Sequence, residues 1–205
     1  MNLERIYIRM KITGIVILLI FYTIYMGKLL LQKKKGIQTD QIAKGRQRDR
    51  VFYIEAIMKI ATYSVVLAEV ICIFTVRPLS TGFCIAGAVI GFIGDGIFAC
   101  AVLTMKDSWR AGLAKEDDTK LVTSGIYKVS RNPAFLGFYC VYLGILLMFF
   151  NWVLLIFSVF AMVMLHLQIL QEEKYLPDVF GGEYVGYKES VCRYIGRKNR
   201  RKNGY

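Results

Sequence analysis

"RNPAFLGFYCVYLGILLMFFNWVLLIFSVFAMVMLHLQILQEE" occupies residues 131–173 and contains two apolar stretches, 133–150 and 152–170, that are separated only by Asn151. A helix needs about 20 apolar residues to cross the hydrocarbon of a bilayer. Two helices joined by so short a connection must run antiparallel. The stretch therefore predicts a helical hairpin that returns residues 171–173 to the end where residues 130–133 begin.

The remaining sequence has the same character. The chain has 205 residues, is 56% hydrophobic, carries a net charge of +12, and contains three further apolar stretches at 12–31, 51–76 and 83–105. The first of these is too long, and too well followed by further stretches, to be a cleaved signal peptide. We predict an all-α, polytopic membrane protein with about five transmembrane helices.

Lysine and arginine are concentrated in segments 32–50, 106–131 and 193–202, whereas the opposite turns contain only Arg77 and the uncharged Asn151. Because basic loops remain in the cytoplasm, all three segments are expected there, which leaves the N-terminus outside. Arg5, Arg9 and Lys11 oppose that last placement. Anionic lipid accounts for the positive charge, so no nucleic-acid partner is predicted.

Few residues are suited to metal or redox chemistry. The five cysteines form no C-x-x-C pair, and His166 is the single histidine. Metal sites need clustered ligands, and a cysteine in an apolar stretch packs as a small hydrophobic residue. No metal is predicted.

Some residues inside the apolar stretches are unusual for lipid-facing positions. Glu69 is deep in its stretch and is expected to face other helices. Asp95 is equally compatible with a site and with a hydrogen-bonded packing role. Gly87 and Gly91 form a G-x-x-x-G motif, which allows close helix packing within a monomer or across a dimer.

A polar cluster is expected where the two ends of the hairpin meet. Asn132 and Pro133 suit an N-cap and a first helical turn, and one interpretation is that they only begin a helix. Alternatively, Arg131 and the helix N-terminus suit an anion, while Glu172 and Glu173 suit a cation or ribose hydroxyls. A single zwitterionic ligand would satisfy both groups.

Two motifs lie at the ends of the hairpin. The first segment is "TKLVTSGIYKVSRNPAFLGF" (119–138), which contains the pattern L-V-T-x-G-x-Y-x-x-x-R-[HN]-P-x-[YF]-x-G. The second is "QEEKYLPDVFGGEYVGYKESVCRYI" (171–195), which contains E-E-x-x-L-x-x-x-F-G-x-x-Y-x-x-Y. "DSWRAGL" (107–113) precedes them. Over about residues 106–195 the chain resembles the isoprenylcysteine carboxyl methyltransferase family, in particular its bacterial members. This family belongs to a larger group that includes phospholipid N-methyltransferases.

The resemblance implies a methyltransferase in the plasma membrane of a bacterium, with S-adenosylmethionine (SAM) bound in a pocket open to the cytosol and a lipophilic or prenylated substrate entering from the bilayer. It divides the chain into N-terminal helices (1–105, with basic loop 32–50), a catalytic region (106–195, with hairpin 133–170 and a C-terminal amphipathic segment) and a basic tail (196–205). The implied catalytic residues are Arg131, Glu172 and Glu173. The implied cofactor-binding residues are Thr119, Lys120, Leu121, Val122, Gly125, Tyr127, Asn132, Pro133, Phe135, Glu172 and Glu173.

The substrate is less well defined than the cofactor. Eukaryotic members carry an arginine shortly before the glutamates, where this chain has His166 and Gln168; these two residues and Tyr187 are the predicted substrate-binding residues. A histidine that is only hydrogen-bonded at the cytoplasmic end is the simpler interpretation of His166. The alternatives to carboxyl O-methylation are N-methylation of a phospholipid or other small lipid, an NADPH-dependent sterol-type reductase, and a non-enzymatic membrane protein of the same architecture.

Overall fold

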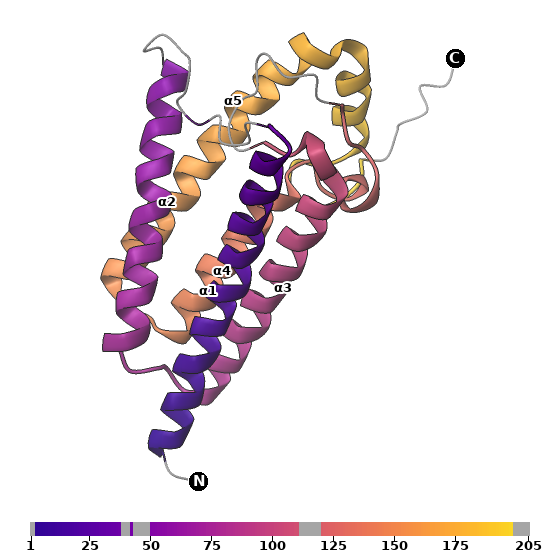
Figure 1. Ribbon diagram of the computed structural model, residues 1–205. Helices are drawn as coiled ribbons and strands as arrows, with labels where there is room; N and C mark the ends of the chain where they lie inside the picture. Colours follow the sequence, from indigo (N-terminus) through magenta and orange to yellow (C-terminus); the bar gives the residue numbers. More distant parts are fainter. Residues whose placement is uncertain (1–2, 38–41, 43–49, 111–119, 199–205) are drawn as a thin grey trace.

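The computed structural model of the protein describes residues 3–37, 42, 50–110 and 120–198. Its elements are α1 (Leu3–Lys34), α2 (Arg50–Thr75), α3 (Thr81–Met105), α4 (Pro133–Met148) and α5 (Trp152–Ser190), with short 3₁₀ helices η1 (Lys106–Ser108) and η2 (Gly125–Lys128). Figure 1 shows these helices as one elongated bundle in which successive helices run in opposite directions. The prediction of an all-α fold with a hairpin at Asn151 is confirmed.

The sides of the bundle are apolar, as expected of a protein surrounded by lipid. Large hydrophobic side chains point outward, among them Leu67, Leu103 and Ile156, each more than half exposed. Helices α1, α2, α3 and α5 are long and apolar enough to cross a membrane. The protein is therefore an integral membrane protein.

Helix α4 has 16 residues, fewer than the predicted stretch 133–150 and fewer than the usual length of a span. It nevertheless extends to the far end of the bundle. The carbonyl of Met148, its last residue, accepts a hydrogen bond from the amide of Leu79 (3.0 Å), which lies in the turn between α2 and α3. Phe149 ends α4 outside helical geometry, and Asn151 begins α5 by accepting a bond from the amide of Val153 (2.8 Å).

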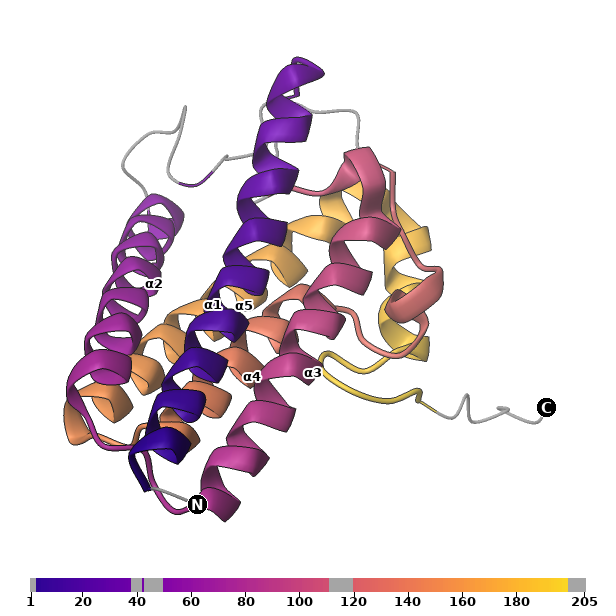
Figure 2. The same ribbon diagram turned by 60° about the horizontal axis from the view of Figure 1, so that its bottom comes forward.

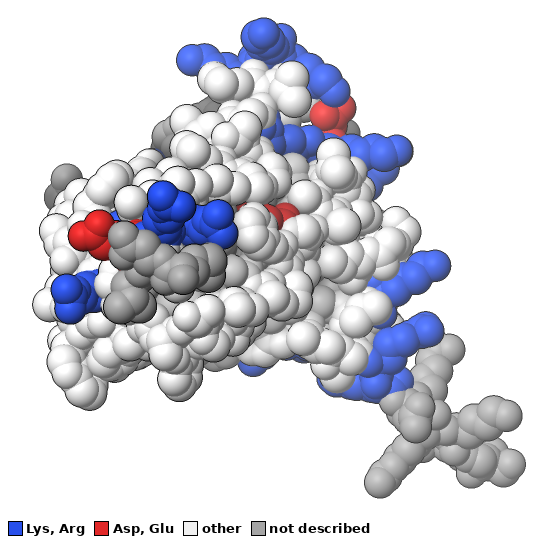
Figure 3. Space-filling view, turned by 90° about the horizontal axis from the view of Figure 1, so that it is seen from below, with Lys and Arg blue, Asp and Glu red and all other residues white. Residues whose placement is uncertain are grey.

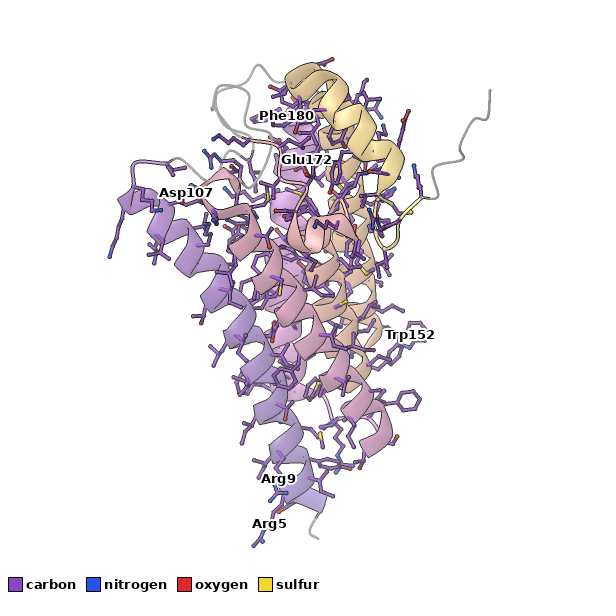
Figure 4. All side chains as sticks on the ribbon, turned by 90° about the vertical axis from the view of Figure 1, so that its right-hand side faces the viewer. Arg5, Arg9, Asp107, Trp152, Glu172 and Phe180 are labelled. Carbon is purple, nitrogen blue, oxygen red and sulfur yellow. The ribbon has the colours of Figure 1, made fainter. Side chains whose placement is uncertain are left out.

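The two ends of the bundle differ in their residues. In Figure 4, Asp107, Glu172 and Phe180 lie at one end, and Arg5 and Arg9 lie at the other. The last turn of α1, the first turn of α2, the segment between α3 and α4, and the end of α5 all meet at the end that contains Glu172. Figure 3 views the molecule from the opposite end, where separate groups of lysine and arginine border a broad uncharged surface. The described parts of the three basic segments thus lie at the same end of the bundle.

Close approach of α3 and α4 depends on glycine. A Cβ atom on Gly144 would lie 2.7 Å from the carbonyl oxygen of Gly87 and 2.8 Å from the amide nitrogen of Gly91. A Cβ atom on Gly94 would lie 2.9 Å from the carbonyl oxygen of Gly137. Small residues let helix backbones touch in this way. Within the described residues, the G-x-x-x-G motif therefore packs inside the monomer, which was one of its two interpretations.

Helix α5 extends far beyond its apolar part and then reverses. Residues 152–170 pack against α2, and the helix continues through Pro177 to Gly181, whose φ of 55° is in the left-handed region that favours glycine. The break at Gly181 turns the last segment of α5 back toward the bundle, as Figure 2 shows. The last segment of α5 is thereby placed over the polar end.

We predict that Gly94→Ala destabilises the protein and Gly96→Ala does not. The added methyl group at position 94 meets the backbone of α4, whereas no atom lies within 4 Å of a Cβ on Gly96 in the same helix. Overpacking of this kind typically costs about 1–3 kcal/mol, and alanine is otherwise the better helix former. The apparent melting temperature in detergent would be measured for both variants; equal values would contradict the packing of α3 on α4.

Candidate active site

The loop before α4 places Asn132 at the N-cap position and Pro133 in the first turn, as predicted. The Asn132 side chain makes no capping hydrogen bond, because its amide group points elsewhere. It donates to Oε1 of Glu173 (3.3 Å) and to the carbonyl of Arg193 (3.2 Å). The Ser130 hydroxyl instead accepts a bond from the amide of Asn132 (3.1 Å). The side chain of Asn132, at the start of α4, therefore binds α5.

Glu173 is the centre of a buried ion cluster. Its carboxylate accepts from Nη2 of Arg131 (2.7 Å), and from Nε and Nη2 of Arg193 (3.1 and 2.8 Å). The side chains of Glu173 and Arg131 are only 4% and 5% exposed, so this pair is removed from water. The hydrogen bond with Glu173 also raises the pKa of the Arg193 guanidinium, which stays charged.

The end of α5 and the C-terminal loop, residues 191–198, bind Arg131 from the other side. Nη1 of Arg131 donates to the carbonyls of Lys188 and Val191, each at 2.9 Å. The backbone amide of Arg131 donates to the carbonyl of Cys192 (3.1 Å). The remaining donor, Nε of Arg131, is buried and has no hydrogen-bond partner among the described residues.

A cavity of about 390 Å³ opens beside this cluster, within the range of sites for small ligands. Its polar half lies at the end of the bundle that contains Glu172. The lining there includes the charged and amide side chains of Arg110, Lys120, Arg131, Asn132, Gln168 and Glu172. A molecule that bears both charges would find complementary groups in this half.

Gln168 and Glu172 form a pair on one face of α5. Nε2 of Gln168 donates to Oε1 of Glu172 (3.0 Å). The Gln168 side chain is fully buried, and within the described residues its Oε1 has no hydrogen-bond partner. Because an unpaired buried acceptor costs about 1–3 kcal/mol, this oxygen is suited to a ligand that brings a donor. Glu172 adds an acidic group beside it.

The other half of the cavity is apolar and lies between α1 and α2, which have few contacts with each other. Its lining includes Tyr25, Met26 and Leu29 from α1, Met58, Tyr63 and Val66 from α2, and Phe138 and Leu165 from the hairpin. The contribution of α1 and α2 was not predicted from the sequence. Their lining residues are ordinary membrane residues, and only tertiary packing brings them to the site.

Tyr127 and Tyr187 close the cavity on the side of η2. The hydroxyl of Tyr187 donates to the carbonyl of Tyr127 (2.7 Å), and this hydrogen bond joins the last segment of α5 to the loop before α4. Burial raises the pKa of Tyr127, which therefore remains a neutral phenol. Trp109 is buried nearby against Tyr25, and its carbonyl accepts from Nε2 of Gln32 (3.1 Å).

Most of the predicted site residues line this cavity, namely Lys120, Leu121, Val122, Tyr127, Arg131, Asn132, Pro133, Phe135, Gln168, Glu172 and Tyr187. Gly125, His166 and Glu173 do not. Nδ1 of His166 shares a short hydrogen bond with the hydroxyl of Tyr194 in the C-terminal loop, away from the lining. Thr119 lies outside the described residues. The roles of these residues in binding and catalysis stay predictions.

Comparison with known proteins gives relatives of one kind. A segment of 117 residues is 32% identical to protein-S-isoprenylcysteine O-methyltransferase of Saccharomyces cerevisiae, covering 55% of this chain and 49% of the yeast protein. Another of 108 residues is 31% identical to protein-S-isoprenylcysteine O-methyltransferase B of Arabidopsis thaliana, covering 51% of this chain and 55% of the plant protein. The chain thus spans about half the length of these two curated relatives. No solved structure matches it significantly.

The sequence model of the isoprenylcysteine carboxyl methyltransferase (ICMT) family matches residues 87–178. This segment runs from the glycines of α3 that contact α4, through the hairpin, to the glutamates of α5. It therefore includes most of the described groups that form the polar half of the cavity. This part of the chain, residues 87–178, is therefore similar to the isoprenylcysteine carboxyl methyltransferase family.

Proposed function

We propose that this protein is a SAM-dependent methyltransferase that esterifies the carboxylate of a lipophilic, isoprenylcysteine-like substrate. The observation that carries the proposal is the division of one cavity into a charged half and an apolar half. A polar cofactor and a prenyl chain have opposite solvation requirements, and this cavity offers a suitable environment to each. The match of residues 87–178 to the family model and the names of the relatives support the same activity.

The residues of the polar half fit SAM. Glu172 and the unpartnered Oε1 of Gln168 suit its amino group or ribose hydroxyls, and the unpartnered Nε of Arg131 suits its carboxylate. When bound, SAM would supply an electrophilic methyl group on a sulfonium centre. The other donors of Arg131 are occupied by Glu173 and backbone carbonyls, so we assign Arg131 a share in cofactor binding and Glu173 the task of positioning it.

The protein's contribution to the reaction is alignment. A carboxylate acceptor is already ionised at neutral pH and needs no general base. Holding two reactants in line and excluding water accounts for large rate enhancements. The buried Tyr127 and Trp109 and the partly buried Phe138 line the cavity and limit the access of water. No residue is required to act as a nucleophile.

The apolar half supplies the route for the lipid. Its walls come from helices whose outer faces contact the bilayer, and α1 and α2 have few contacts with each other beside it. A prenyl chain that enters there would leave its polar head near the level of Lys59 and Gln168. From the excess of lysine and arginine in the segments that meet at this end, we propose that the site faces the cytoplasm.

The first test is incubation of the purified protein, in host lipid, with methyl-tritiated SAM and a farnesylated cysteine acceptor. We expect labelled product from which mild base releases volatile methanol, because a methyl ester is hydrolysed and an N-methyl group is not. Label that resists base would contradict the carboxylate acceptor and support N-methylation. Failure to bind SAM at all, measured separately by calorimetry, would exclude the methyltransferase proposal.

The two adjacent glutamates should respond differently to the same substitution. Glu173→Gln leaves the buried Arg131 without its counter-ion, and breaking a buried pair in this way typically costs about 3–5 kcal/mol. We expect a clearly lower melting temperature in detergent. Glu172→Gln keeps an acceptor for Gln168, so we expect near wild-type melting but SAM binding weakened about tenfold through loss of one charge-assisted bond. The reverse pattern would contradict these assignments.

A further inference from the structure

Four polar groups converge in the interior of the bundle, away from the charged half of the cavity. They are the carboxyl of Glu69 on α2 and the hydroxyls of Tyr22 on α1, Tyr142 on α4 and Ser158 on α5. Glu69 and Tyr142 are fully buried, and Ser158 is 1% exposed. Within the described residues, none of these polar atoms makes a hydrogen bond of acceptable geometry. The prediction that Glu69 faces other helices is thus confirmed.

These groups come from four helices but lie at one level. The hydroxyls of Tyr22 and Tyr142 face each other, and both tyrosines are within electrostatic reach of Glu69. Val65 and Ala161 belong to the same buried cluster between the antiparallel helices α2 and α5. Glu69 is one turn beyond Val65 and Ser158 is about one turn before Ala161, which puts Ser158 near the level of Glu69 in the bundle.

The apolar half of the cavity reaches this cluster at Tyr22, and Glu69, Tyr142 and Ser158 are buried behind its lining. Tyr22 itself lines the cavity there, as do Val66 and Phe138, each one turn before Glu69 and Tyr142 respectively. Lys59 lines the cavity nearer to its polar half and is ten residues before Glu69 in α2. This separation corresponds to about 15 Å along the helix axis. A chain that fills the apolar half would therefore end beside these groups.

Packing alone does not account for such a cluster. An unpartnered buried polar group costs about 1–3 kcal/mol, and an ionisable residue inside the membrane is more costly still. Leucine, phenylalanine and alanine would fill the same volume without that cost. Retention of four such groups around the end of a ligand cavity points to a ligand that brings the missing hydrogen bonds.

We propose that Glu69, Tyr142, Tyr22 and Ser158 form a subsite for a hydroxyl group at the far end of the substrate's prenyl chain. A hydroxyl can donate to Glu69 and accept from a tyrosine, so one group satisfies both kinds of partner. A free cation is disfavoured because it would have to pass the apolar walls at Val66, Phe138 and Leu165. This inference rests on the proposed function and extends it to the class of substrate.

The test compares two acceptors, a farnesylated cysteine and the same molecule with a hydroxyl on its terminal isoprene unit. For the wild-type protein we expect kcat/KM to be about tenfold higher for the hydroxylated acceptor, the equivalent of one net hydrogen bond. In the double variant Glu69→Leu, Tyr142→Phe the ratio should fall to one or below. Ser64→Ala, on the same helix but bonded to Ile60, should keep the wild-type ratio. Equal use of both acceptors by the wild-type protein would overturn the proposal.

A second measurement separates this proposal from the proposed reaction. Without ligand, Glu69→Leu should raise the apparent melting temperature, because it removes an unpartnered buried carboxyl; a lower value would show that Glu69 has a partner in the fold and overturn the subsite. The rise in melting temperature on adding each acceptor reports binding without turnover. Discrimination between the acceptors in binding, with no methyl transfer, would count against the reaction and still support the subsite. No discrimination in either measurement would overturn the subsite.

Discussion

The carboxylate of Glu173 is the contact on which the polar end of this protein depends. It joins the loop before α4, through Arg131 and Asn132, to α5 and to the C-terminal loop, through Arg193. A buried ion pair is stable only when its charges are matched and their hydrogen bonds are satisfied. Because the three segments share one carboxylate, the groups of the candidate site are positioned together, and displacement of one segment would disturb the others.

Rigidity in the membrane has a different origin. The glycines of α3 and α4 allow backbone-to-backbone contact, which gives a tightly packed pair on which α1 lies; Gly91 is packed by Ile17 of α1. Helix α2 is held mainly by α5 instead, so the space between α1 and α2 remains for the cavity. The arrangement thus combines a rigid support for the polar half with an apolar half that borders the bilayer.

Polar residues inside this bundle serve distinct purposes. Glu173 is neutralised by two arginines and fixes the fold, whereas Glu172, one residue earlier, faces the cavity beside Gln168. Glu69 has no hydrogen-bond partner among the described residues and is buried one turn beyond Val66, which lines the same cavity. Their surroundings, rather than their residue type, separate a structural carboxylate from groups suited to a ligand.

The lengths of the apolar stretches, and the single residue between the last two, were enough to predict much of this fold from the sequence alone. The five helices, the antiparallel hairpin and the meeting of Arg131 with the glutamates followed from the requirement to cross a membrane. The sequence could not distinguish Glu172 from Glu173, since both are acidic residues at the same helix end. It also gave no sign that Asn132 would bind Glu173, that His166 would bind Tyr194, or that α1 and α2 would line the cavity. Those features depend on side-chain contacts between residues far apart in the chain, which only the tertiary structure decides.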